Sequence, residues 1–417
     1  MTVLSDLHTH IRTRTLVSLA TLNFFLADAR DGMGPFLDAW LVTQGWTPFQ
    51  LGLLATSGGI IGLLGGIPAG ALVDATRFKR SLIIVPVILT TLLAFACILW
   101  PTKPVVFATQ ALTALAGLLI GPAMVAISLG LVGRKGFGQQ VSHNEAWSHT
   151  GNIVLLIGTW WISSEIGLSG VATLMILTTV VTVLATLSIN AHHIDHEVAR
   201  GQGEAQQKGR PNQPSQLQVL WSNRVLLVFA LTLMLFHFGN APISRLLIQQ
   251  FAMNLDQPFK TTAIIMIVGQ VSAIAGALLA PAAARRFGLR HMVLFALATL
   301  PVRGVIAAQA QSFDVIYPVQ ILDGLGAGLL GILTPLMLEK LLAGTGHFNL
   351  GFAAVLTVQG IGATLSSVVA GMVVQESGYG AAFLFHGLIA PLALLLFGLA
   401  GREQRLILPG NSGHGTQ

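Results

Sequence analysis

Twelve long runs of hydrophobic residues follow one another along the chain, separated by short polar segments. Each run approaches the ~20 residues that a helix needs to cross a bilayer. The runs lie near residues 15–38, 50–73, 81–100, 104–132, 144–163, 168–190, 225–248, 261–284, 290–310, 315–338, 350–374 and 380–400. The pattern therefore predicts an all-α membrane protein with twelve transmembrane helices.

Glycine-bearing positions in the first half recur in the second half at a constant offset of 211 residues. One register that holds across several segments indicates two similar halves. The matched glycines are Gly58 with Gly269, Gly65 with Gly276, Gly117 with Gly328, Gly151 with Gly362 and Gly167 with Gly378. We therefore expect two pseudo-symmetric six-helix bundles: residues 1–190, and residues 224–417 including a short cytoplasmic tail.

The segment between the two bundles, residues 191–223, is polar and rich in Gly, Gln, Pro and Ser. This composition predicts a flexible cytoplasmic linker. The segment contains His192, His193 and His196, but their spacing fits no specific zinc pattern. We expect no metal site here and no cofactor elsewhere.

Composition supports the membrane class. Hydrophobic residues make up 53% of the chain and charged residues 9%, against roughly a quarter charged in soluble domains. The net charge of +6 comes from basic residues in short loops between apolar runs, which excludes a nucleic-acid partner and favours membrane lipids. The lone Cys97 excludes an intrachain disulfide.

Lys and Arg residues are concentrated on one side of the predicted membrane. Seventeen of the 22 lie in the termini and in the loops that join even to odd spans, whereas the opposite loops hold only Lys103 and Lys260. The positive-inside rule therefore places both termini in the cytoplasm.

The loop between the second and third runs carries a glycine, an aspartate and basic residues at ordered spacing: Gly70, Asp74, Arg77 and Lys79. A second copy keeps the basic-Gly-basic tail as Arg286, Gly288 and Arg290. With the six-plus-six arrangement, this loop resembles the best-known motif of the major facilitator superfamily, although Ala75 and Arg77 depart from its pattern. The resemblance spans nearly the whole chain and implies a secondary transporter that works by alternating access.

The resemblance also implies that Asp74, Arg77 and Lys79 bias the inward/outward equilibrium as a cytoplasmic gate; the alternative is a charge cluster that only sets topology. Signatures of the drug-proton antiporter branch are poorly matched, since Gln110 stands where that branch carries an Arg motif. Residues 28–36 and 346–349 look like those of a less characterised bacterial and fungal branch.

Three ionisable residues lie near the middle of the first run: Asp28, Arg30 and Asp31. Charges inside a bilayer are costly and need a partner, a watery cavity or a role. The following Gly32, Gly34 and Pro35 favour a bent or interrupted helix beside a cavity. We expect one of the aspartates to couple transport to protons; a static Asp–Arg lock is the alternative.

Three further charges lie in the second half. Arg245 is near the end of the seventh run, where it could contact substrate or extend to the interface. Arg303 and Asp323 lie at similar depth on the ninth and tenth runs, so we expect a structural ion pair, with Asp323 able to reach the central cavity. Weaker candidates for substrate contact are the uncharged polar residues Gln110, His149, Asn152, His237, Asn240 and Gln359.

The leading hypothesis is a proton-coupled secondary transporter of a small organic solute, with efflux favoured over uptake. The alternative is an uptake permease for an anionic metabolite or siderophore. A non-transporting sensor and a membrane-embedded enzyme are remote, because no soluble appendage and no nucleophile-base pattern accompanies His149, His237 or His386. The expected setting is the cell membrane, with the chain working as a monomer beside its lipids.

Overall fold

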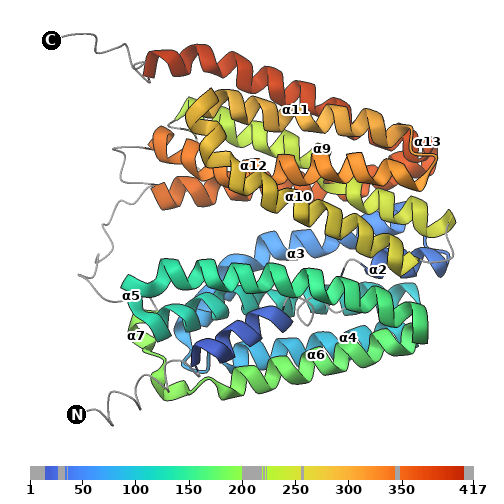
Figure 1. Cartoon of the computed structure of the whole chain (residues 1–417), viewed down its shortest axis with the longest axis vertical. Coiled ribbons are helices and arrows are strands. Elements are labelled where there is room, and N and C mark those ends of the chain that lie inside the picture. The colour runs from blue at the N-terminus through green and yellow to red at the C-terminus, as the bar shows by residue number, and fades with distance from the viewer. Residues whose placement is uncertain are drawn as a thin grey trace. The chain divides into compact units, whose positions relative to one another are not determined.

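The computed structural model describes residues 15–26, 33–34, 36–199, 218, 221, 223–254, 258–342 and 348–407. All regular elements within these residues are helices (Figure 1). The predicted all-α class is therefore confirmed.

The first half begins with the helix Thr15–Leu26. A turn at Met33 and Gly34, where Gly34 has a positive φ of 48°, precedes the short helix α2 (Phe36–Thr43). The first predicted run is thus not one continuous helix. The remaining elements are α3 (Pro48–Ala75), α4 (Ser81–Leu99), α5 (Lys103–Ile166), α6 (Leu168–Ser188), η1 (Ala191–His193) and α7 (His196–Ala199).

The described residues of the second half form a second series of helices. They are α9 (Arg224–Asn254), α10 (Pro258–Phe287), α11 (Leu289–Ala308), the 3-10 turn η2 (Phe313–Val315), α12 (Ile316–Leu342) and α13 (Phe348–Ile407), preceded by the isolated helical residues 218 and 221. Most of these helices are apolar over more than 18 residues, as a membrane span requires.

Nine helices among the described residues are long and apolar enough to cross a membrane. One of them, Gly351–Leu399, bends at Gly378 and contains two spans. The part of α5 beyond its bend at Gly133 and the helix Thr15–Leu26 supply the other two. The architecture is the predicted one of twelve spans.

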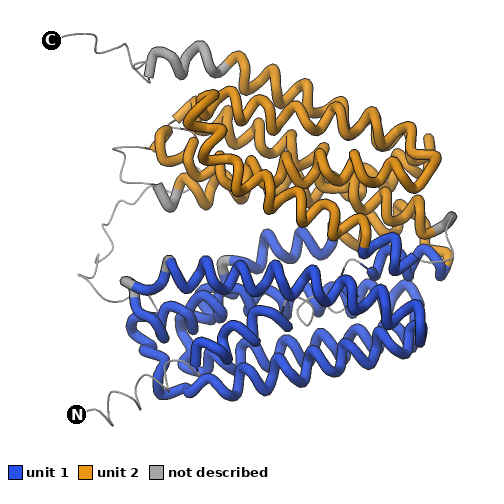
Figure 2. Tube along the Cα trace, in the orientation of Figure 1, with its two compact units in different colours: residues 1–44, 57–210, 256–263 blue, residues 45–56, 211–255, 264–417 orange. Residues whose placement is uncertain are grey.

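The chain divides into two compact units (Figure 2). Unit 1 comprises residues 1–44, 57–210 and 256–263, and unit 2 comprises residues 45–56, 211–255 and 264–417. The first turns of α3 are therefore grouped with unit 2, and the first turns of α10 with unit 1.

The core of unit 1 joins the helix Thr15–Leu26 to α4 and α5 through buried aliphatic side chains such as Leu22, Val87 and Ile127. Ile194 and Ala199 belong to the same core, and Asp195 N donates to the carbonyl of Gly130 at 3.0 Å. The start of the predicted linker, residues 191–199, is therefore folded against unit 1. This part is folded because its aliphatic side chains are buried in the core. The polar average composition of residues 191–223 gives no sign of these few buried side chains. Most of the remaining linker lies outside the described residues.

Matched glycines have matched structural roles in the two units. Gly167 and Gly378 both adopt positive φ, 69° and 84°, where two helices meet. A Cβ at Gly151 would collide with the carbonyl of Phe24, and a Cβ at Gly362 would collide with the carbonyl of Met234. Gly151 thus permits close contact with the helix Thr15–Leu26, and Gly362 permits close contact with α9.

Candidate functional site

The most deeply buried charge in unit 2 is Arg303 on α11, whose side chain is 0% exposed. Its NH1 lies 2.8 Å from Oδ1 of Asp323 on α12. The structure thus places in contact the two residues that the sequence predicts to pair. A buried charge without a partner would be strongly destabilising, so the carboxylate permits the guanidinium to lie inside the bundle.

Helix α9 contributes two more members to this network. Arg303 NH1 donates to Oδ1 of Asn240 at 2.6 Å, and its NH2 donates to Oγ of Ser244 at 2.7 Å. Asn240 Nδ2 and Ser244 Oγ in turn donate to the two carboxylate oxygens of Asp323, at 2.9 and 3.1 Å. Asn240 and Ser244 are four residues apart and therefore share one face of α9.

Gln320 completes the network from α12, where it lies one turn before Asp323. Its Nε2 is 3.2 Å from Ser244 Oγ, and its side chain is 1% exposed. The network carries one positive and one negative charge on three helices. Ser244 and Gln320 were missed by the sequence analysis because uncharged polar residues in spans usually serve helix contacts.

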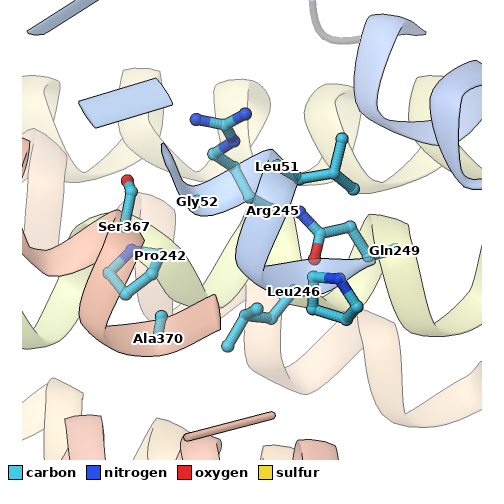
Figure 3. Close-up of a pocket in the computed structure, with 9 residues that line it drawn as sticks. Leu51, Gly52, Pro242, Arg245, Leu246, Gln249, Ser367 and Ala370 are labelled. Carbon is cyan, nitrogen blue, oxygen red and sulfur yellow. The ribbon is translucent and has the colours of Figure 1, made fainter. Parts of the chain in front are cut away.

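Arg245, a further predicted site residue, is half-buried on α9. It lines a small cavity of unit 2 with Gln249 and with Ser367 of α13 (Figure 3). The cavity measures about 10 Å³, which is room for about one water molecule. This small cavity itself has no room for an organic solute.

Unit 1 contains a larger cavity of about 220 Å³, called here the unit 1 cavity. It lies among the helix Thr15–Leu26 and both parts of α5. Its lining is half polar and half apolar: Asn23, Leu26, Ile120, Gly121, Met124, Val125, Ser128, Val141, Asn144, Glu145 and Ser148. The cavity is smaller than most ligand pockets, which measure ~300–1,000 Å³, but like them it combines apolar side chains with a few polar groups.

Hydrogen bonds fix one polar wall of the unit 1 cavity. Asn144 Nδ2 donates to Ser128 Oγ at 2.9 Å, and Gln140 Nε2 donates to Asn144 Oδ1 at 2.8 Å. Glu145, with its side chain 69% exposed, lies 3.9 Å from Nε2 of the predicted site residue His149. The sequence signal for this wall is the recurrence of polar residues at 140, 144 and 148, the spacing of one helix face.

The other predicted substrate or proton residues are dispersed. Asp28, Arg30 and Asp31 lie outside the described residues. Gln110 and Asn152 are half-buried on α5, and Gln359 is half-buried on α13. None of these three is among the residues that line the two cavities or form the Arg303 network.

Lys79 of the predicted gating motif and the adjacent Arg80 bind backbone carbonyls near helix ends. Buried Lys79 donates through Nζ to the carbonyl of Val73 at 2.9 Å, near the end of α3. Arg80 NH1 donates to the carbonyls of Leu187 and Ile189, at 3.2 and 2.8 Å, at the end of α6. Cations are favoured there because the last carbonyls of a helix lack partners and carry partial negative charge.

Unit 2 repeats this attachment. Arg290 NH2 donates to the carbonyl of Gly398 at 3.0 Å, and Gly398 is the 211-residue mate of Leu187. Gly288 precedes α11 with a φ of 86°, and the Arg286 guanidinium lies 5.3 Å from the ring centroid of Phe287. Arg80 thus ties the start of α4 to the end of α6, and Arg290 ties the start of α11 to Gly398 in the C-terminal part of α13. The remaining motif residues are Gly70, which is half-buried, and Asp74 and Arg77, which are exposed.

Comparison with known proteins gives concordant results. The family model of the Major Facilitator Superfamily matches residues 19–300. Two sequences from Mycobacterium tuberculosis, strains CDC 1551 and H37Rv, each described as an uncharacterized MFS-type transporter, are 36% identical over 392 residues and cover 94% of both chains.

Solved structures share the fold at low identity. The nucleoside transporter NupG superposes with a TM-score of 0.74 at 17% identity over 94% of this chain and 99% of its own, and a NupG mutant gives 0.75 at 16% over 93% and 99%. A bacterial homolog of the human lysosomal transporter Spinster, in an inward-facing and unoccupied conformation, gives 0.70 at 15% over 94% and 97%. The chain is a multi-pass membrane protein and a secondary transporter that belongs to the major facilitator superfamily.

Proposed function

We propose that the chain moves a small organic solute across the cell membrane by alternating access and couples this movement to protons. The observation that carries the proposal is the asymmetric burial of the ion pair in unit 2. The side chain of Asp323 is 19% exposed, whereas that of Arg303 is 0% exposed. The acid is therefore the partly accessible member of the pair, and its cation is enclosed.

Protonation of Asp323 would change the whole network. A neutral carboxyl no longer balances the charge of Arg303, and one of its oxygens becomes a donor. Asn240 and Ser244, which now donate to this carboxylate, would have to reorient. A proton at Asp323 thus has a means to alter the packing of α9, α11 and α12, which is what coupling requires.

Asp28 and Asp31 remain proposed as further proton or substrate groups, and Arg30 as their counter-charge.

The distribution of Lys and Arg supports a topology with both termini in the cytoplasm. We also propose that the protein acts as a monomer among membrane lipids. Efflux remains the favoured direction.

The alternative, uptake of an anionic metabolite, depends on arginines that face a substrate. Arg303 is neutralised by Asp323 at 2.8 Å, and Arg245 lines a cavity of about 10 Å³. Neither forms an open anion site in this conformation. The balance of charge therefore favours a neutral or cationic solute.

A proteoliposome assay tests the proposal without a known substrate. Vesicles that contain the purified protein and the pH-sensitive dye pyranine receive solutes one at a time from a metabolite and drug library. We expect at least one inward solute gradient to change the luminal pH, with alkalinisation for antiport and acidification for symport. Solutes that enter with no pH change, in protein vesicles but not in empty ones, would contradict proton coupling.

A further inference from the structure

The unit 1 cavity differs in charge from the network of unit 2. Of its eleven lining residues, Glu145 is the one that carries a formal charge. No lysine or arginine is among these eleven residues. The described lining residues therefore carry a net negative charge, whereas Arg303 and Asp323 cancel each other.

The neutral polar groups of this cavity match a ligand that donates hydrogen bonds better than one that accepts them. Asn23 Nδ2 already donates to Leu19 O at 2.7 Å, so its amide oxygen is available to accept. The Asn144 amide is held between Ser128 and Gln140. With the Glu145 carboxylate and the Ser148 hydroxyl, the wall offers several oxygen acceptors. An ammonium group, which has donors and no acceptor, matches this set.

The rest of the lining is mostly apolar: Leu26, Ile120, Met124, Val125 and Val141. These side chains can pack against hydrocarbon that an inorganic cation lacks. The volume of about 220 Å³ lies below the ~300–1,000 Å³ of most ligand pockets. The cavity therefore fits a small molecule rather than a large one.

We propose that the unit 1 cavity binds a small organic cation, with the ammonium group at Glu145 and the apolar body against α5. Glu145 is then a specificity-determining residue that the sequence analysis did not single out. The inference rests on the proposed function only in taking the bound cation to be the transported solute; binding itself is tested independently of transport.

The test uses charged thiol reagents as the organic-ion probes. Cys97, the lone cysteine, is replaced by Ala, and His149 is replaced by Gln so that its imidazole cannot offset the carboxylate. Ser148→Cys is then introduced, one turn from Glu145. The purified full-length protein reacts with the methanethiosulfonate reagents MTSET, a trimethylammonium, and MTSES, a sulfonate. Each rate is divided by the rate of the same reagent with free 2-mercaptoethanol.

We expect the thiol introduced by Ser148→Cys to react with the cationic reagent about fivefold faster than with the anionic one after this correction. A unit charge ~6 Å away in water shifts local cation and anion concentrations in opposite directions, by about threefold each before salt screening. Glu145→Gln should bring the ratio to about one, and Glu145→Asp should preserve most of it. Glu165→Gln, which removes a carboxylate elsewhere on α5, should leave the ratio unchanged.

Three results would overturn the proposal. A thiol at position 148 that reacts with neither reagent would show that the cavity does not admit an organic ion. A corrected ratio near or below one would show that it does not prefer a cation. A ratio that survives Glu145→Gln would assign the preference to another group. None of these rates depends on Asp323 or on a proton gradient. The cation site can therefore be refuted while proton coupling stands, and proton coupling can be refuted while the cation site stands.

Discussion

Arg303 on α11 and Asp323 on α12 form an ion pair 2.8 Å apart in which the acid is 19% exposed and the cation is 0% exposed. Arg303 also donates to Asn240 and Ser244, so its loss would leave Asp323 and two α9 side chains without their shared donor. The pair therefore links the stability of unit 2 to the chemistry proposed for it.

We expect Arg303→Ala to lower the free energy of unfolding by roughly 3 kcal/mol, since removing one partner leaves an uncompensated buried charge. The double variant Arg303→Ala with Asp323→Ala should lose less than the sum of the two single variants. Reversible unfolding in mixed micelles measures both effects. Additive losses would mean that the two side chains do not interact.

Two glycines related by the 211-residue repeat should respond differently to alanine. A Cβ at Gly328 would collide with the carbonyl of Ala273, whereas a Cβ at Gly117 meets nothing within 4 Å. Gly328→Ala should therefore lower the melting temperature clearly. Gly117→Ala should leave it unchanged or raise it slightly, because alanine is the better helix former. Equal effects would show that close packing at this position is the same in both units.

The hydrogen bonds that Arg80 and Arg290 donate to neighbouring helices should stabilise each unit separately. Arg80→Ala removes the donor to the end of α6, and Arg290→Ala removes the donor to Gly398. Each change should cost about 1.5–3 kcal/mol, the usual range for a hydrogen bond that involves a charged group. Thermal unfolding of the purified variants tests this, with the exposed Arg77→Ala as the control. A loss with Arg77→Ala as large as with Arg80→Ala would point to net loop charge instead.

Thr56 joins α3 to α13 within unit 2. Its hydroxyl donates to the carbonyl of Thr364 at 2.9 Å and accepts from Val368 N at 3.1 Å. Thr56→Val keeps the shape and removes both bonds, so we expect a loss of about 1–2 kcal/mol. Thr56→Ser should retain most of the stability. If the serine variant is as unstable as the valine variant, the methyl group rather than the hydroxyl makes the contact.

Hydrophobic run length was sufficient to predict the twelve spans, because a bilayer dictates both the length and the polarity of a spanning helix. The similar depth of Arg303 and Asp323 in the membrane, counted along the ninth and tenth runs, was sufficient to predict that they pair. The same reasoning could not identify Ser244 and Gln320, since hydrogen-bond partners depend on helix rotation, which an apolar run does not specify.

The unit 1 cavity was missed for a different reason. The predicted fifth span begins at residue 144, whereas α5 is helical throughout Lys103–Ile166 with one bend at Gly133. Gln140 was therefore assigned to a loop and Glu145 was placed at a span boundary. A polar face of a helix has the same local composition as a loop. The spacing of its polar residues, every three or four positions, separates it from a loop only if the segment is already taken to be helical.

Solute exchange and proton-driven accumulation, measured on the same Asp323→Asn proteoliposomes, test the central claim most directly. Asparagine keeps the shape of the side chain and cannot titrate, so the variant should still exchange labelled for unlabelled solute but should not accumulate it in response to an imposed pH gradient. Asp314→Asn, in the exposed turn η2, is the matched control and should do both. Accumulation by the Asp323→Asn protein at the wild-type level would contradict the account.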